Sequence, residues 1–193
     1  MQKNRGWLFK FFRDKNLKYY NSKIKTPAYL NLDEFFPGYK ILEENWEEIK
    51  LEVENVVKSK KGIPRFHEID NGQSYISDNN EGSWGLINLL LYDMWHSRNV
   101  DLCPKTASLV KGLDGVKSAY FSILSPGKII PPHFGPYKGI IRYQLALSVP
   151  KKGECKLVVD GKDYFWKEGE SVLWDDTYLH EVKNNTDEVR VAL

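Results

Sequence analysis

Apolar residues recur at three- and four-residue spacing in the first half of the chain, which is typical of amphipathic helices. Residues 42–56 show this spacing, with glutamates in the early turns, where the helix dipole favours negative charge. This helix is predicted to end in the lysine-rich run 58–61, before Gly62. Residues 104–112 predict a second helix, because a proline stands near its start and a glycine just past its end.

Between these helices the pattern is less regular. Residues 62–83 are polar and rich in glycine, asparagine, aspartate and serine, so the sequence predicts a loop with a short strand near residues 74–76. Residues 84–95 are apolar on most faces and indicate a buried segment, with His96 as a polar cap at its C-terminal end. His67, a lone histidine in the polar stretch, is expected to be structural or exposed.

From about residue 116 the pattern changes to short runs in which apolar and polar residues alternate, which predicts strands. The strongest turn signal is Asp160 followed by Gly161, which predicts a tight hairpin. Many short strands in this stretch favour a β-sandwich or jelly roll. The last of them ends with the chain itself, so it is either unusually short or cut off. The predicted strands are residues 119–124, 128–130, 140–149, 156–159, 162–166, 171–174 and 189–193.

The chain has 193 residues, of which 41% are hydrophobic, so it can bury a core and is too apolar for disorder. We expect an N-terminal arm (residues 1–26) and a single domain, with helical support over residues 27–115 and a β core over residues 116–193. Cys103 and Cys155 are expected to be free thiols rather than a disulfide. No transmembrane run or signal peptide is recognisable, which predicts a cytoplasmic protein, with membrane association as an alternative.

The net charge of +2 is unevenly distributed. Residues 1–26 contain eight Lys and Arg residues and one acidic residue, Asp14, a net charge of +7, so residues 27–193 carry −5. We expect the apolar side chains of this arm to dock on the domain; the alternative is peripheral contact with an anionic membrane surface. Nucleic acid is not expected as a partner, because the rest of the chain is acidic. The apolar residues of the arm are Trp7, Leu8, Phe9, Phe11 and Phe12.

Two histidines stand where predicted strands meet turns. His133 follows two prolines, and His180 follows a polar turn after an apolar strand. Such positions on opposing strands of a jelly roll converge on one pocket, and imidazoles with open coordination positions suit iron(II). The usual carboxylate ligand would stand two residues after the first histidine, where this chain has Gly135. Three possibilities stay open: two protein ligands, help from Asp175 or Asp176 through water, or no metal.

Two arginines accompany the histidines. Arg190, on the last predicted strand, can hold a carboxylate by paired hydrogen bonds; the alternative is a surface ion pair with Glu188. Arg142 lies in a largely apolar strand and is predicted to point inward, where an arginine usually requires an anionic ligand. Two imidazoles and two guanidiniums are the groups that a metal ion and a small dicarboxylate would need.

Residues 120–193 resemble the aspartyl/asparaginyl β-hydroxylase family of Fe(II)- and 2-oxoglutarate-dependent oxygenases. The resemblance rests on SxxxPGxxxxPHxGPxxxxxRxxLxL in residues 122–147, then C-x-L and W-x-E-G-E, then DDTYxHEVxNxTxxxR in residues 175–190. In the first half, NWEEIKLE at residues 45–52 and CPKT at residues 103–106 are similar to the lipid A 2-hydroxylase branch. The combined C-terminal pattern is highly specific, whereas either histidine alone would mean little.

The resemblance implies a double-stranded β-helix core, that is, a cupin-like jelly roll, preceded by an α-helical part. It also implies Fe(II), 2-oxoglutarate and O2 as cofactors. His133 and His180 would be the catalytic metal ligands. Arg190 and Ser122 would hold the distal carboxylate of 2-oxoglutarate.

Other residues are placed around the same pocket by the resemblance. Arg142 would contact the cosubstrate or an anionic part of the substrate, and Trp84 would line the pocket. Gln144 stands where the family commonly has histidine; its amide donates a hydrogen bond but carries no charge, which puts the substrate end in doubt. Gly135 agrees with the peptidyl-aspartate hydroxylases, which work with two histidines.

The implied activity is hydroxylation of an unactivated carbon, first of all in aspartyl or asparaginyl residues of a peptide or protein. The alternatives are the acyl chain of lipid A, a small amino-acid-like metabolite, or a non-catalytic β-sandwich that binds a carboxylate. The basic arm favours a membrane-linked substrate, and Gly135 favours a peptide. Gln144 favours the non-catalytic alternative, against which the complete set of histidines, Arg190 and Ser122 argues.

Overall fold

Ten strands in two antiparallel sheets form the core of the computed structural model, which describes residues 3–59, 62–70, 73–78 and 82–193. The strands are β1 (Trp84–Leu91), β2 (Met94–Trp95), β3 (Ser118–Leu124), β4 (Ile129–His133), β5 (Arg142–Ser148), β6 (Glu154–Val159), β7 (Lys162–Phe165), β8 (Ser171–Trp174), β9 (His180–Asn185) and β10 (Arg190–Ala192).

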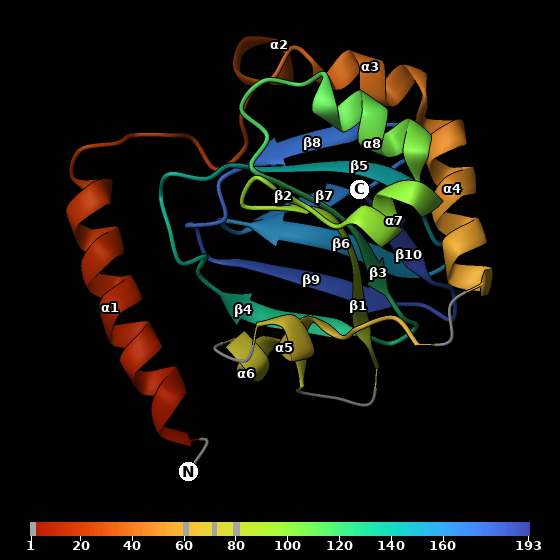
Figure 1. Ribbon diagram of the computed structural model, residues 1–193. Helices are drawn as coiled ribbons and strands as arrows, with labels where there is room; N and C mark the ends of the chain where they lie inside the picture. Colours follow the sequence, from red (N-terminus) through yellow and green to blue (C-terminus); the bar gives the residue numbers. More distant parts are fainter. Residues whose placement is uncertain (1–2, 60–61, 71–72, 79–81) are drawn as a thin grey trace.

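The two sheets have the strand orders β2-β1-β3-β10-β5-β8 and β4-β9-β6-β7. From β3 onward the chain crosses to the other sheet at every connection except the β6–β7 hairpin (Figure 1). This alternation is the winding of a double-stranded β-helix, so the predicted jelly-roll core is confirmed. The hairpin is confirmed as well, because Asp160 and Gly161 have φ values of 52° and 72°, as a type I′ turn requires.

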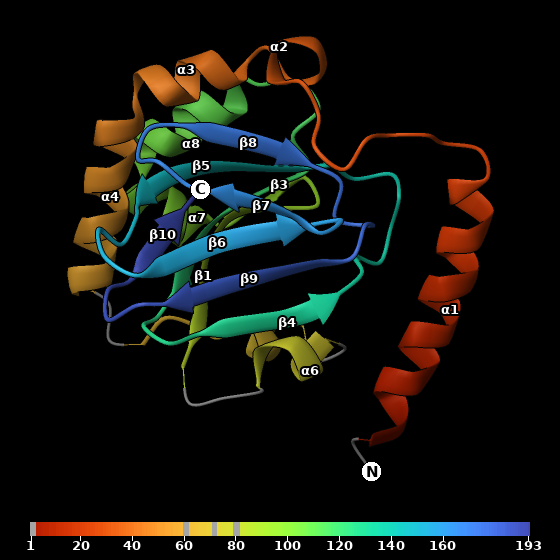
Figure 2. The same ribbon diagram turned by 180° about the vertical axis from the view of Figure 1, so that it is seen from behind.

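Helices cover the outer face of the six-stranded sheet (Figure 2). Helix α4 presents Ile49, Val53 and Val56 to this face, in the predicted spacing, and α8 forms where the second helix was expected. Residues 60–61 of the predicted helix end lie outside the described residues. The helices are α1 (Lys3–Asn21), α2 (Leu32–Phe35), α3 (Tyr39–Glu44), α4 (Trp46–Ser59), α5 (Phe66–Ile69), α6 (Ser74–Ser77), α7 (Ser97–Leu102) and α8 (Pro104–Lys111).

Glu52 of α4 joins the two main helices. Its carboxylate accepts hydrogen bonds from the backbone amides of Lys105 (2.8 Å) and Thr106 (2.9 Å) and from the hydroxyl of Thr106 (2.6 Å). The first amides of a helix lack partners within the helix, so an acceptor from a neighbouring helix satisfies them and fixes how the two helices pack.

The alternation of side chains along β5 separates structural from chemical residues. Leu145 and Leu147 pack in the outer cluster with α4, whereas Ala146 belongs to the cluster between the sheets. Because side chains two apart share a face, Arg142 and Gln144 point to the same interior as Ala146. Strand β3 repeats the pattern: Phe121 packs outward against the helices, and Tyr120, Ser122 and Leu124 face inward.

Two local predictions are wrong. Residues 74–76 form helix α6 rather than a strand, and this turn buries Ile76 against the interior cluster. His96 does not cap the end of a single segment, because Tyr92 and Asp93 have positive φ values and reverse the chain between β1 and β2. His96 instead caps the N-terminus of α7, where its Nδ1 accepts a hydrogen bond from the amide of Asn99 at 3.3 Å.

The basic arm is a helix, α1, and its expected docking is wrong for most of the apolar side chains. Trp7, Leu8, Phe11 and Phe12 are 67%, 49%, 41% and 61% exposed. Contact with the domain comes from the opposite side of the helix, through residues 10, 13, 17 and 20, because an α-helix turns about 100° per residue.

Two further expectations can be compared with the structure. Cys103 and Cys155 are both buried and are not joined in a disulfide, as the sequence predicts. Among the described residues, no helix combines the length and the apolar composition needed to cross a membrane.

Candidate active site

The two predicted histidines come together at one end of the four-stranded sheet. His133 is the last residue of β4 and His180 the first of β9, and the two are paired across the neighbouring strands. Their ring centroids lie 4.0 Å apart, and the ring of Trp174 lies 4.7 Å from that of His180. Strand pairing thus brings two imidazoles from distant parts of the sequence to one point.

Hydrogen bonds hold both imidazole rings in the same way. Nδ1 of His133 bonds the carbonyl of Pro131 at 2.8 Å, and Nδ1 of His180 bonds the carbonyl of Tyr178 at 2.9 Å. A carbonyl can only accept, so each Nδ1 carries the proton and each Nε2 keeps a free lone pair. Burial lowers the pKa of His133 to about 3 and that of His180 to about 4, so both rings are neutral at neutral pH. A neutral imidazole whose Nε2 lone pair is free can coordinate a metal ion.

Asp176 occupies the space beside Gly135. A Cβ atom built at Gly135 would overlap with the carboxylate of Asp176, and the Gly135 amide donates to the Asp176 carbonyl at 2.6 Å. The same carboxylate accepts a hydrogen bond from Nε of Arg142 at 2.7 Å, while its buried Oδ1 atom has no partner. Within the described part of the chain, no group of three or more His, Cys, Asp or Glu residues is arranged to hold a metal ion. The protein therefore offers two imidazoles, with a carboxylate close by that is tied to an arginine.

The close contact between Gly135 and the Asp176 carboxylate leads to a prediction about stability. Gly135→Ala is expected to lower the free energy of unfolding by about 1–3 kcal/mol, because the Asp176 carboxylate is buried and cannot yield without losing Arg142. Gly112→Ala, where the added Cβ meets ordinary contacts, is the matched control and should change it by less than about 1 kcal/mol. Urea unfolding of both variants measures this. Equal stability of Gly135→Ala and the wild type would mean that Asp176 is free to move.

Asp175 is not available to a metal. Its carboxylate is fully buried and accepts hydrogen bonds from Lys138 Nζ (2.5 Å), from the Thr177 amide (2.9 Å) and hydroxyl (2.6 Å), and from the Thr26 hydroxyl. Such a fully satisfied buried ion pair is structural: it fixes the turn between β8 and β9 that delivers His180.

Arg190 is a buried cation without an anion. Its side chain is 1% exposed, its Nη1 makes long contacts with the carbonyl (3.5 Å) and hydroxyl (3.4 Å) of Ser122, and its Nε has no partner. The guanidinium lies over the ring of Trp166, 4.8 Å from its centroid. No described carboxylate lies within ion-pair distance of it, so the alternative pair with Glu188 does not form. Burial lowers the pKa of Arg190 to about 10, which shows that the fold disfavours its charge when it stands alone.

Several other predicted residues lie around Arg190. Trp84 donates from its indole nitrogen to the Ser122 hydroxyl at 3.0 Å and stacks on Phe66. Gln144 faces the same interior, and its buried carbonyl oxygen has no partner. Buried polar atoms without partners are uncommon in folded proteins and favour a missing ligand or water. In the described chain they include Gln144 Oε1, Trp166 Nε1, Trp174 Nε1, Asp176 Oδ1 and Arg190 Nε.

Arg142 differs from Arg190 because it already has its anion. Besides Asp176, it donates from Nη1 to the Tyr120 hydroxyl at 3.2 Å. The inward orientation is as predicted, but the charge that it meets comes from the protein. Sequence reasoning did not select Tyr120 or Trp166. The two-residue period that places Ser122 inward would have found Tyr120. Trp166 follows β7, and its place in the W-x-E-G-E pattern is the signal that could have found it.

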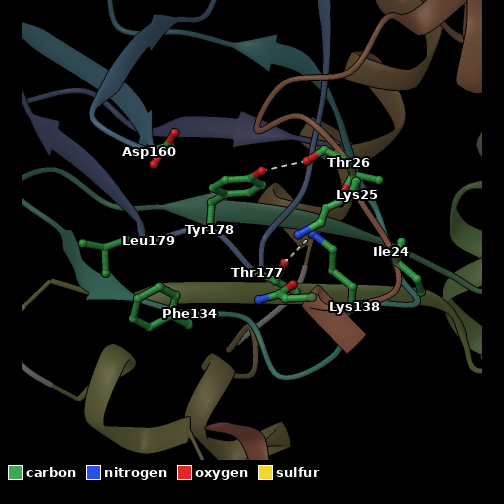
Figure 3. A pocket seen from close by; sticks show the side chains of 10 residues that line it. Ile24, Lys25, Thr26, Phe134, Lys138, Asp160, Thr177, Tyr178 and Leu179 are labelled. Atoms are coloured by element: carbon green, nitrogen blue, oxygen red, sulfur yellow. Dashed lines mark hydrogen bonds between the residues drawn. The ribbon is translucent and has the colours of Figure 1, made fainter. Parts of the chain in front are cut away.

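A cavity of about 450 Å³ is lined partly by chain neighbours of the two histidines, although neither histidine is among the residues that line it (Figure 3). Phe134 and Leu179, the chain neighbours of His133 and His180, line one side, and Ile24 and Lys25, from the segment after α1, line another. The Tyr178 hydroxyl closes part of the wall by donating to the Thr26 carbonyl at 2.7 Å. The cavity combines apolar walls with cationic and hydroxyl groups and one carboxylate, that of Asp160.

Comparison with known proteins defines the family. The family model described as "Aspartyl/Asparaginyl beta-hydroxylase" matches residues 43–193, which is most of the chain and includes every candidate residue of the site. The chain belongs to this family, and the resemblance seen in its sequence is confirmed.

Curated relatives include, by name, a lipid acyl hydroxylase and an aspartyl/asparaginyl hydroxylase. The chain is 34% identical over 179 residues to the ornithine lipid ester-linked acyl 2-hydroxylase of Rhizobium tropici, which covers 92% of this chain and 62% of that protein. It is 30% identical over 162 residues to the human aspartyl/asparaginyl beta-hydroxylase, and this match covers 79% of this chain and 20% of the human protein. The chain thus spans less than two thirds of these relatives.

Solved structures overlap with the chain less extensively. A Cupin_2 domain of an XRE family transcriptional regulator from Enterobacter cloacae has a TM-score of 0.33 at 19% identity, over 39% of this chain and 74% of that one. A second structure, TT1209 from Thermus thermophilus, has a TM-score of 0.32 at 20% identity, over 39% of this chain and 67% of that one.

Proposed function

We propose that this protein is an Fe(II)- and 2-oxoglutarate-dependent hydroxylase. The observation that carries the proposal is that two neutral imidazoles with free Nε2 atoms share a barrel with a buried guanidinium that lacks an anion. A metal ion and a small dicarboxylate would complete both groups. Membership of a hydroxylase family supports the same chemistry.

The residues present fit these cofactors. His133 and His180 would hold iron(II) through Nε2, and Arg190 with the Ser122 hydroxyl would hold the distal carboxylate of 2-oxoglutarate. Bound together, iron and 2-oxoglutarate supply the oxidising power by which O2 converts a C–H bond to C–OH, with succinate and CO2 as the other products. The unpartnered Nε–H of Arg190 gives the dicarboxylate a further hydrogen-bond donor, whereas the unpartnered Oε1 of Gln144 is an acceptor and suits a donor group of the substrate or a water molecule.

The chain's own contribution is positioning and exclusion of water. The backbone carbonyls of Pro131 and Tyr178 fix the imidazole tautomers, so no proton has to move before a metal binds. The ring of Trp166 covers the guanidinium of Arg190 and keeps bulk water from competing for it. The Asp176–Arg142 pair lies close enough to the histidines to act on their charges, and it would orient a polar part of the substrate or a water molecule.

For the substrate, we favour the acyl chain of a lipid. The Rhizobium relative, named for a lipid acyl 2-hydroxylase, matches 92% of the chain, beyond the region of the family model, whereas the human peptide-type relative matches 79%. Phe134, Leu179 and Ile24, which line the cavity, suit a hydrocarbon chain. Aspartyl or asparaginyl residues of a peptide are the second candidate, favoured by the human relative and by Gly135.

Anaerobic titration tests the cofactor assignment. Iron(II) and 2-oxoglutarate, added to the folded protein without O2, should produce a metal-to-ligand charge-transfer band that needs both components. The band should persist in His67→Ala, which removes a histidine away from the site. Absence of a band from the folded wild type would leave the protein as a carboxylate-binding β-sandwich. Turnover assays with an acyl lipid and with an aspartyl peptide then separate the two substrate candidates.

A further inference from the structure

The exposed face of α1 is unusual for a protein surface. Trp7, Leu8, Phe11 and Phe12 lie within one side of the helix, and Trp7 stacks on Phe11 with ring centroids 6.0 Å apart. Tyr19 continues the same side towards the C-terminal end of the helix and is 57% exposed. Large contiguous apolar patches on a protein surface mark sites of interaction.

Lysines accompany these aromatic residues. Lys15 and Lys18 are exposed on the same side of α1, and Lys15 Nζ lies 4.4 Å from the ring centre of Phe11. Aromatic rings with flanking lysines are the composition of helices that lie in the interface of an anionic bilayer, where rings enter the headgroup region and ammonium groups meet lipid phosphates.

Helix α1 is fixed to the domain by its other side. Arg13 donates to the Tyr75 hydroxyl at 3.4 Å and lies over the ring of Phe134, which is next to His133. Leu17 is buried, and Tyr20 meets Tyr137 edge to face. Figure 2 shows the helix beside the end of the sheet where β4 ends and β9 begins. The exposed face therefore has a fixed direction relative to the end of the sheet that carries the histidines.

The charge distribution also selects one orientation on a membrane. Residues 1–26 carry +7 and residues 27–193 carry −5, so an anionic surface attracts α1 and repels the rest of the domain. The same asymmetry disfavours nucleic acid, which would need a basic groove on the folded domain.

We propose that α1 is an interfacial helix that binds the surface of an anionic lipid bilayer through Trp7, Phe11 and Phe12. The segment after α1, which includes Ile24 and Lys25, also lines the cavity together with Phe134 and Leu179, so docking would bring the cavity mouth close to the lipid headgroups. The proposal concerns a surface and does not depend on iron or 2-oxoglutarate.

The test uses the full chain without added metal or cosubstrate. Sedimentation with vesicles of phosphatidylcholine alone, and of phosphatidylcholine with phosphatidylglycerol, measures partitioning. We expect binding to the anionic vesicles that weakens as salt is raised, and little binding to the neutral ones. The double variant Trp7→Glu and Phe12→Glu should bind at least about tenfold more weakly. Phe165→Glu, which changes a phenylalanine that is 57% exposed on β7, should bind as the wild type does.

Three results would overturn the proposal. The first is that the folded wild type binds neither kind of vesicle. The second is that Phe165→Glu loses as much binding as the double variant. The third is that the wild type does not bind vesicles but forms an oligomer, whereas the double variant is a monomer, which would make this face an interface between copies of the chain. Circular dichroism of each variant controls for folding. Because binding is measured without cofactors, a missing charge-transfer band would not affect the outcome.

Discussion

The His180→Ala variant is expected to lose 2-oxoglutarate turnover by roughly 100-fold or more and to give no charge-transfer band, because a site with two protein ligands cannot lose one and keep its metal. His133→Ala should behave in the same way, since the two rings are equivalent in their hydrogen bonds. Turnover, measured as succinate formed, and the anaerobic band are the two readouts.

Folding must be shown to survive the change. The imidazole of His180 is buried and packs against Trp174, so its loss should lower the free energy of unfolding by no more than about 3 kcal/mol. His67→Ala is the matched control, because His67 bonds the Ser77 hydroxyl at 3.0 Å outside the site. Turnover retained by either site variant would remove that histidine from the metal site.

The Arg190→Met variant is expected to separate binding from stability. Loss of a buried charge partner for a carboxylate costs about 2–5 kcal/mol, so 2-oxoglutarate should bind at least roughly 30-fold more weakly, with iron(II) affinity changed far less. Without cofactors, the variant should be at least as stable as the wild type. In the wild type the guanidinium of Arg190 is buried without an anion, and the methionine side chain, apolar and of similar length, avoids that penalty.

Two measurements test this pair of effects. Titration of each cofactor at saturating concentration of the other gives the affinities, and urea unfolding gives the stability. Arg98→Met, at an exposed arginine in α7, should change neither. Equal losses of iron and 2-oxoglutarate affinity would refute the role of Arg190. A large loss of stability would mean that its present contacts, with Ser122 and Trp166, already satisfy it.

Much of the core follows from alternation in the sequence. The alternation of residues in β5 and β3 predicts both strands. It also predicts that Arg142 and Ser122 point inward, because few polar residues occur in a strand that is apolar on both faces. Asp160 and Gly161 predict their turn because few residue pairs adopt two positive φ angles. Strand β9 was not assigned from the sequence, since its buried positions include His180 and Asn184 as well as Val182.

Features that depend on contacts between distant segments could not be predicted from the sequence. The position of Asp176 against Gly135 arises from the meeting of two loops, so no local pattern encodes it. The face of α1 that contacts the domain is made by Arg13 and Leu17, not by its most apolar residues, so a composition argument chose the wrong side. The cofactors, the domain division and the cytoplasmic location stay predictions.

The contact between Gly135 and Asp176 also limits how this site can change by mutation. A carboxylate can enter at position 135 only after Asp176 has been replaced by a smaller residue. That replacement in turn leaves Arg142 without its anion, so it is tolerated only if Arg142 changes or another acid appears nearby. The intermediate steps are each unfavourable, although the end state need not be. Replacement of one residue at a time therefore tends to preserve the two-histidine arrangement, whichever substrate is under selection.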